Sequence, residues 1–162
     1  TAHRNRTNRF DDLRKVLAAI HDARPEALLI ATVLIGLAQR VLNVPDQVHK
    51  FYRDREEEFA AKILPRLSTG DQTLWDEFDW AVSENRPNDP VKTLAMFKTL
   101  PTRKAGHTHV KGYDYVLCVP VYVDNVNPPS LPRPNPLRVD VDEEYQQMLH
   151  QICAAYTARW HM

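Results

Sequence analysis

Residues 25–42, PEALLIATVLIGLAQRVL, decide the fold, because they contain the longest apolar run of the chain. Pro25 suits the first turn of a helix, and apolar residues lie on nearly all sides of the segment until Gln39 and Arg40. The β-branched residues of the segment leave a buried strand as the alternative. Its length favours a helix, so we predict a helix over 25–42 that lies in the middle of a helical bundle.

Five other segments repeat apolar residues at helical spacing. The first segment starts at Arg9, the second covers 46–64 and the third covers 71–84. The fourth runs from Asp89 to Pro101, and the fifth follows the predicted cap Asp142. Asp followed by Pro at the first helical position is a strong start signal for the fourth of them. The last carries an apolar stripe, which we expect to face the bundle: Tyr145, Met148, Leu149, Ile152, Tyr156 and Trp160.

Residues 113–123, YDYVLCVPVYV, form the one convincing strand. Its odd-numbered residues share one face, which we predict to be the hydrophobic face. Pro120 has no N–H to donate, so the strand lies at an edge or bulges there. Segments 107–111 and 137–141 are the expected partners. The sequence therefore predicts a mainly α fold, a helical bundle of about six helices with a small antiparallel β-hairpin or meander near residues 107–141.

The same segments suggest a simple domain organisation. We expect residues 1–9 to form a flexible basic arm, because they hold three Arg and no large apolar side chain. We expect residues 10–162 to form a single mostly helical domain, because no internal linker is long enough to divide it.

Composition limits the class of protein. The 162 residues include 21 basic and 21 acidic side chains, so the formal net charge is zero. This balance argues against a protein that coats nucleic acid along its whole surface, since such binding needs many cations to neutralise phosphates. Cys118 and Cys153 form no CxxC pair, no signal-peptide pattern is present, and no apolar run reaches the ~20 residues of a membrane span. We expect two free thiols, with one Cys118–Cys153 disulfide as the alternative, in a soluble, intracellular protein with no membrane partner.

Motifs of catalytic sites are absent from the sequence: it has no G-x-S-x-G, Walker loop, G-x-G-x-x-G or HExxH. We therefore expect no enzyme activity, no cofactor and no metal. One alternative stays open at His107 and His109. Two residues apart on a strand, both rings would point to the same side and chelate a metal if the fold supplied a third ligand.

A helix-turn-helix that binds DNA or RNA is the alternative function. Residues 37–53 resemble that motif, with Gln47, His49, Lys50 and Arg53 placed to face a groove. The resemblance departs from the motif at Leu42, which stands where the turn usually has Gly. The acidic run 56–58 would also repel phosphates.

Three segments carry features that a packed core does not need, and we expect them to contact a partner. They are the basic arm, the basic loop 98–111, and the proline loop 127–136, which holds five prolines and should run extended. The expected contact residues are Arg4, Arg6, Arg9, Arg103, Lys104, Lys111, Leu131 and Arg133. The sequence thus predicts a non-catalytic interaction or assembly subunit that docks on a protein partner or on copies of itself.

Overall fold

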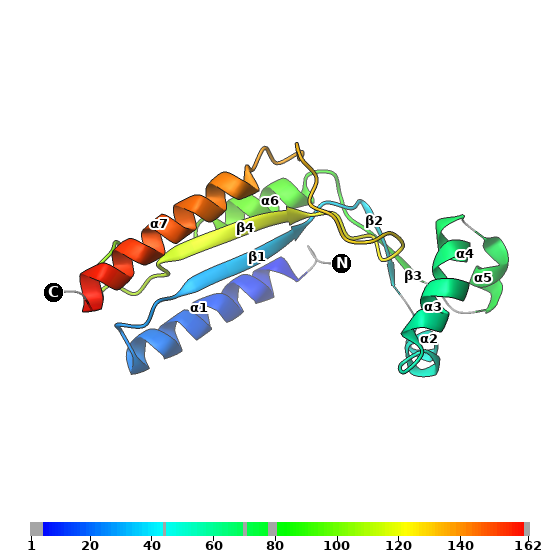
Figure 1. The fold of residues 1–162 in the computed structure, drawn as a ribbon, viewed down its shortest axis with the longest axis horizontal. Helices are drawn as coiled ribbons and strands as arrows, with labels where there is room; N and C mark the ends of the chain where they lie inside the picture. Colours follow the sequence, from blue (N-terminus) through cyan, green and yellow to red (C-terminus); the bar gives the residue numbers. More distant parts are fainter. Residues whose placement is uncertain (1–4, 44, 70, 78–80, 161–162) are drawn as a thin grey trace. The chain divides into compact units, whose positions relative to one another are not determined.

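The computed structural model describes residues 5–43, 45–69, 71–77 and 81–160, which contain both helices and strands (Figure 1). The chain divides into two compact units. Unit 1 comprises Leu37–Pro87 and Val121–Leu131, and unit 2 comprises Ala2–Gly36, Asn88–Pro120 and Pro132–Met162. Whether residues 10–162 fold as one domain stays a prediction.

Unit 2 is built on a two-stranded sheet of β1, Ile30–Gly36, and β4, Tyr115–Val121. The Asp114 N–H donates to the Leu29 carbonyl at 2.7 Å, next to the start of both strands. The Leu37 N–H donates to the carbonyl of the last β4 residue at 2.8 Å, at the end of both strands. Because the contacts join start to start and end to end, the two strands are parallel.

The side chains of β1 alternate between a covered and an open face. Ala31, Val33 and Ile35 are buried, and the residues between them are exposed, with Leu34 at 64%. A period of two is that of a strand, so the predicted helix over 25–42 is wrong. The segment is apolar at consecutive positions because β1 carries apolar residues on both its buried and its exposed face. Its β-branched residues fit the extended backbone of a strand.

Two helices cover the buried face of this sheet. α1, Arg6–Ala23, contacts α6, Asp89–Phe97, and α6 contacts β1. Rings of Phe10 and Phe97 meet edge to face with centroids 5.9 Å apart. The core between these elements contains Leu17, Leu29, Ala31, Val33, Ile35, Phe97, Leu100, Tyr113, Val116 and Cys118. The start of α6 at Asp89 confirms the predicted start signal.

The remaining predictions for unit 2 have mixed outcomes. The last helix is confirmed as α7, Val141–Trp160, and the strand within 113–123 is confirmed as β4. Its partner is β1, not 107–111 or 137–141, and its better-buried face is the even-numbered one of Val116 and Cys118. The first helix begins three residues earlier than predicted, so residues 6–9 of the expected arm are helical.

Unit 1 combines an antiparallel strand pair with short helices. β2, Arg40–Asn43, pairs with β3, Ala81–Glu84. Between these strands the chain forms α2 (Asp46–Phe51), α3 (Glu56–Lys62), α4 (Leu64–Ser68) and α5 (Gln72–Glu77). The core of unit 1 contains Leu42, Val48, Ile63, Leu67 and Leu74. Leu42 belongs to β2, Ile63 lies between α3 and α4, and the other three residues belong to helices.

The predicted helices over 46–64 and 71–84 are also wrong in extent. A turn follows α2, where the Arg55 N–H donates to the Tyr52 carbonyl at 3.0 Å. Pro65 lies in the first turn of α4 rather than after a helix end, because a missing N–H costs nothing there. Residues 81–84 leave the helix to pair with β2.

These differences overturn the predicted fold class. The described residues form a mixed α/β structure with two two-stranded sheets, not a six-helix bundle with one hairpin. Within the described ranges, no helix is both long enough and apolar enough to cross a membrane.

Candidate assembly interface

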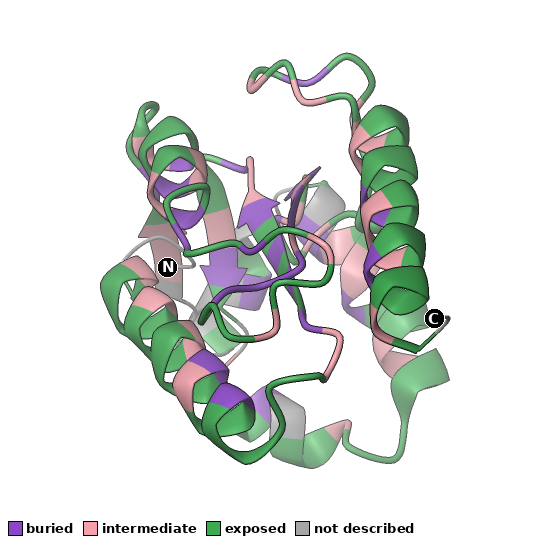
Figure 2. Ribbon diagram, turned by 90° about the vertical axis from the view of Figure 1, so that its left-hand side faces the viewer, coloured by how far each residue is buried: buried purple, intermediate pink, exposed green. Residues whose placement is uncertain are grey.

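The long helix α7 has two different apolar faces. Met148 and Ala155, seven residues apart, are buried against unit 2. A second set is turned away from the core: Tyr145 is 47% exposed, Leu149 37%, Tyr156 47% and Trp160 46%, with Ile152 half-buried among them. We call these five residues the α7 stripe. In Figure 2, α7 is the long helix that ends at the C label, and most of its surface is coloured as exposed.

Helix geometry explains why the stripe is separate from the buried face. Each residue turns the helix by about 100°, so residues next to Met148 and Ala155 in sequence point about a quarter-turn away from the core. Leu149 and Tyr156 are those neighbours. The rings of Tyr156 and Trp160 contact each other, with centroids 5.2 Å apart. Large apolar side chains gathered on one side of an exposed helix are typical of a protein–protein contact.

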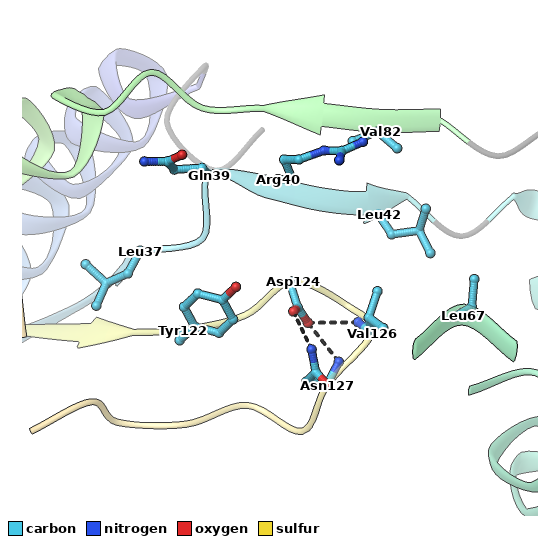
Figure 3. Close-up of a pocket in the computed structure, with 10 residues that line it drawn as sticks. All are labelled: Leu37, Gln39, Arg40, Leu42, Leu67, Val82, Tyr122, Asp124, Val126 and Asn127. Atoms are coloured by element: carbon cyan, nitrogen blue, oxygen red, sulfur yellow. Dashed lines mark hydrogen bonds between the residues drawn. The ribbon is translucent and has the colours of Figure 1, made fainter. Parts of the chain in front are cut away.

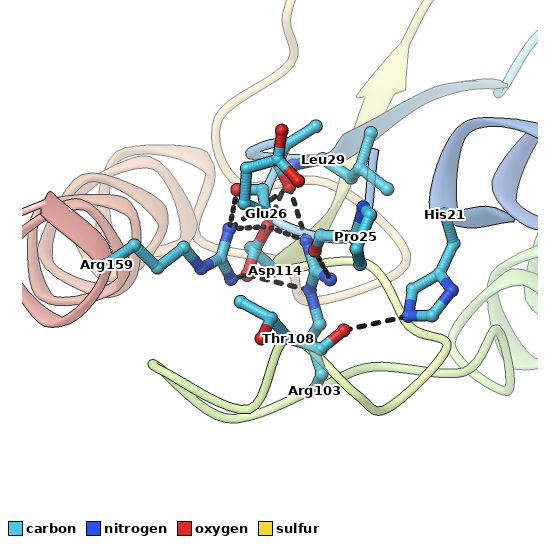
Figure 4. A network of polar contacts seen from close by, with 9 residues as sticks. His21, Pro25, Glu26, Leu29, Arg103, Thr108, Asp114 and Arg159 are labelled. Carbon is cyan, nitrogen blue, oxygen red and sulfur yellow. Dashed lines mark hydrogen bonds and ion pairs between the residues drawn. The ribbon is translucent and has the colours of Figure 1, made fainter. Parts of the chain in front are cut away.

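A buried network of charges anchors the end of α7 (Figure 4). Both carboxylate oxygens of Asp114 accept hydrogen bonds from Arg103 and Arg159, and Oδ2 also accepts from the Leu29 N–H at 2.8 Å. The three charged side chains are 0–2% exposed. Both guanidinium groups also donate to backbone carbonyls within residues 25–27. The network therefore joins the entry to β1, the entry to β4 and the end of α7.

Close backbone packing places Arg103 in this network. The Arg103 N–H donates to the Tyr113 carbonyl at 2.9 Å, and the Tyr113 N–H donates to the Pro101 carbonyl at 2.8 Å. A Cβ added at Gly112 would lie 2.6 Å from the Thr102 carbonyl carbon. Only glycine permits this approach without a backbone shift.

Asp114 is ionised in this environment. Burial raises the pKa of its carboxyl group, but hydrogen bonds from Arg159, Arg103 and the Leu29 N–H outweigh burial, and the pKa lies below its usual value. One carboxylate thus compensates two buried guanidinium groups. The network fixes the position of α7 and retains one unit of positive charge.

The basic loop was expected to contact a partner, and its three expected residues have different surroundings. Arg103 is 4% exposed and belongs to the buried network. Lys111 forms an ion pair with Asp22 at 2.5 Å. Lys104 is exposed and forms no ion pair within the part of the chain that the structure describes.

The arm and the proline loop show the same pattern of internal pairing. Arg6 pairs with Asp89 at 3.2 Å, and Arg9 lies 3.8 Å from Asp12. Arg133 forms two hydrogen bonds with Asp142, at 2.6 and 2.9 Å. Leu131 is 46% exposed, whereas Arg4 lies outside the described residues. Arg6, Arg9 and Arg133 thus face acids of the same chain, and the role of the expected contact residues in binding stays a prediction.

The first helix that the helix-turn-helix alternative requires is not present in the described ranges of the structure. Residues 40–43 are the strand β2, and α2 is only six residues long. Gln47, Lys50 and Arg53 are exposed, and the side chain of His49 lies outside the described set. The acidic start of α3 follows closely, as the sequence suggested.

The two histidines considered as metal ligands lie beside each other. Rings of His107 and His109 stack with centroids 5.6 Å apart, and both residues are exposed in a loop. The carbonyl of Thr108 between them lies 2.9 Å from Nε2 of His21. No group of three or more acidic, histidine or cysteine residues that could hold a metal occurs among the described residues.

Unit 1 contains a separate pocket of about 590 Å³ (Figure 3). Its walls are mostly apolar, with Leu37, Leu42, Val82 and Tyr122 among the lining residues. Asp124 also lines it, but its carboxylate accepts three hydrogen bonds from Val126 and Asn127. Burial raises the pKa of Asp124, and these hydrogen bonds lower it below the usual value. The pocket suits an apolar group better than acid–base chemistry.

Sequence reasoning missed both the α7 stripe and the Asp114 network. The apolar positions of α7 were interpreted as one inward stripe, although they span two adjacent faces of the helix. The width of that apolar arc was the available signal. Nothing local marks Asp114 and Arg159, which are 45 residues apart in sequence.

Comparisons with known proteins found no matching family model, no matching curated protein and no matching solved structure.

Proposed function

We propose that this protein is a non-catalytic assembly subunit that pairs with a second copy of itself through the α7 stripe. The observation that carries the proposal is the exposure of four large apolar residues along one side of a 20-residue helix. From their exposed fractions, they present roughly 400 Å² of apolar surface per copy. Two such surfaces, with the polar atoms around them, reach the lower end of specific interfaces.

The spacing of the stripe favours a second copy over a different partner. When two α7 helices lie antiparallel about a two-fold axis near Ile152, Tyr145 of one copy faces Trp160 of the other. In the same register, Leu149 faces Tyr156. Each contact then occurs twice, and every large residue of the stripe meets an apolar residue. A two-fold interface requires this self-complementary order.

Charge favours the antiparallel direction. The first turn of α7 contains Asp142, Glu143 and Glu144. Parallel pairing would bring two acidic turns together and align two helix dipoles, whereas antiparallel pairing separates the acids by the length of the helix. The proposed dimer therefore avoids repulsion that a parallel one would create.

Sedimentation equilibrium of the full chain tests the proposal. The wild-type protein should approach twice the 18.7 kDa of one chain as its concentration rises. Leu149→Glu should remain a monomer, because a carboxylate within the stripe would be desolvated on pairing. Thr157→Glu is the matched control, since it adds the same charge on the same helix outside the stripe, and it should still dimerise.

Circular dichroism should show equal helix content in all three proteins, because Leu149 and Thr157 are both exposed. A wild-type protein that is monomeric throughout the concentration range would overturn the proposal. So would equal association of the two Glu variants.

A further inference from the structure

We propose that unit 2 has a binding cavity for a phosphate-bearing small molecule, independent of self-association. The cavity measures about 880 Å³ and lies between three segments. Its lining includes Lys98 and Lys104 from the loop after α6, Tyr115 from the start of β4, and His150 and Gln151 from α7. Its volume is within the range of small-molecule sites in proteins.

The charges around this cavity favour an anion. Lys98, Arg103 and Lys104 line it, and Asp114 is the one acidic residue among the lining residues that the structure describes. Asp114 is bound by Arg103 and also by Arg159, so the buried network behind the wall is positive by one charge. That excess charge lies in a region of low polarisability, where it attracts an anion more strongly than a solvated lysine does.

The buried network leaves hydrogen-bonding capacity unused. Nε of Arg159 is buried and has no hydrogen-bond partner among the described residues. Its guanidinium group is already held by Asp114 and by two carbonyls, so its charge, rather than a direct contact, would act on a ligand in the cavity. An anion outside the wall would compensate the positive excess.

The hydrogen-bond donors for the ligand come from side chains that line the cavity. Lys104 has no ion pair within the described ranges, in contrast to Lys98, which donates to both carboxylate oxygens of Glu144 at 2.8 Å. His150 and Gln151 supply an imidazole and an amide on the same wall. An ammonium group with neighbouring N–H donors is suited to phosphate, which offers several acceptor oxygens around one centre.

Tyr115 contributes a neutral group to the wall. Burial, followed by the neighbouring Glu144, raises the pKa of Tyr115 to about 12. Its hydroxyl stays protonated and donates to Glu144 at 3.1 Å, which keeps that acid turned to Lys98 and the tyrosine. Glu144 is therefore compensated by Lys98 and opposes an anion in the cavity less than a free carboxylate would.

The cavity and the α7 stripe occupy different sides of the helix. Residues of the cavity wall, His150 and Ala154 among them, project about 100–160° around the helix from Leu149 and Tyr156 of the stripe. A ligand in the cavity and a second copy on the stripe would not compete for the same surface. Failure of one proposal leaves the other unaffected.

Isothermal titration calorimetry of the full chain with inorganic pyrophosphate tests the cavity. We expect saturable one-to-one binding that weakens as salt rises, because the contact is between opposite charges. Lys104→Gln should weaken binding at least about tenfold, the effect of losing one charge-assisted hydrogen bond. His150→Gln should weaken it to a smaller extent. Lys92→Gln, which removes an exposed lysine of α6 outside the cavity, is the control and should bind as the wild type does.

A titration with malonate, a dicarboxylate, distinguishes a site for phosphate from a site for any anion. Tighter binding of pyrophosphate than of malonate supports a phosphate site, and equal or tighter binding of malonate overturns that assignment. Absence of saturable heat up to about 10 mM pyrophosphate, the weakest end of meaningful affinity, would overturn the site itself. Equal affinity of Lys104→Gln and Lys92→Gln would do the same.

Discussion

Asp114 holds together three segments of unit 2 that are distant in sequence. Its carboxylate accepts from two arginines that are both almost completely buried, and these arginines also donate to the chain entering β1. Ion pairs of this kind are costly to break from one side, because the remaining charges lose their compensation away from water. The stability of unit 2 should therefore depend on this residue more than on any surface pair.

We predict that Asp114→Asn lowers the free energy of unfolding by about 3–5 kcal/mol at neutral pH. Asp142→Asn is the control, since it breaks an exposed pair with Arg133 and should cost less than about 1 kcal/mol. Urea denaturation of both variants measures the difference. Equal losses in the two variants would contradict a structural role of the buried network.

The same substitution has a defined pH dependence. Because the pKa of Asp114 in the folded protein lies below its usual value of 3.8, the unfolded chain takes up this proton first as the pH falls. The contribution of Asp114 is therefore complete above pH 3.8 and is lost below it. The gap in stability between wild type and Asp114→Asn should narrow as the pH falls through that region.

β1 shows how one strand can be apolar on both faces. Ile35 is fully buried in the core that also contains Leu17 of α1 and Phe97 of α6. Leu34, the residue before it, is 64% exposed. A helix through the same residues would not separate adjacent side chains so completely, since neighbours differ there by about 100° rather than 180°. Substitutions at these two positions therefore test the strand.

We predict that Ile35→Ala destabilises the protein by about 2–5 kcal/mol, as expected when a large side chain is removed from a packed core. Leu34→Ala should change stability by less than about 1 kcal/mol, because it removes atoms that are already in water. The free energies of unfolding of both variants, measured in urea, provide the comparison. Similar losses at both sites would contradict the observed alternation.

At the scale of the whole molecule, the exposed apolar residues of the α7 stripe lie on a regular element that is itself firmly anchored. α7 is attached to unit 2 by Met148 and Ala155 along its length and by Arg159 near its end. A rigid helix loses little conformational entropy on binding, so most of the apolar contact contributes to association. The proposed dimer therefore needs no refolding of the chain.

Cross-linking should reveal the direction of the two helices in the dimer. Cys153 is exposed next to the proposed two-fold axis, while Cys118 is buried and burial raises the pKa of its thiol. A short bismaleimide should therefore join two wild-type chains through Cys153. In Gln146→Cys combined with Cys153→Ser, antiparallel helices hold the two new thiols roughly 20 Å apart, and little cross-linking should occur.

In a parallel dimer the result would be different, because identical residues of parallel helices lie next to each other at every position. Efficient cross-linking at position 146 would contradict the antiparallel arrangement. The single Cys153→Ser variant should give no cross-linked species, which controls for reaction at Cys118.

The sequence by itself determined the elements whose signals are local. The Asp-Pro start of α6, the long final helix and the β-branched strand β4 each depend on residues within a few positions of one another, and all three are confirmed. Local steric and capping preferences act in the same way in any fold. The formal net charge of zero also concealed local differences in charge along the chain. Most of the basic residues that we predicted to contact a partner are paired with nearby acidic residues.

Only the tertiary structure decided the identity of residues 25–42 and the role of α7. An apolar segment of that length is compatible with a buried helix and with a strand. The strand forms here because β4, more than 70 residues away in sequence, supplies hydrogen bonds along the edge of β1. The side of α7 that faces the core likewise depends on the hydrogen bond between Arg159 and Asp114. Sequence periodicity shows which residues share a face, but burial requires a partner surface, and that surface exists only in the folded chain.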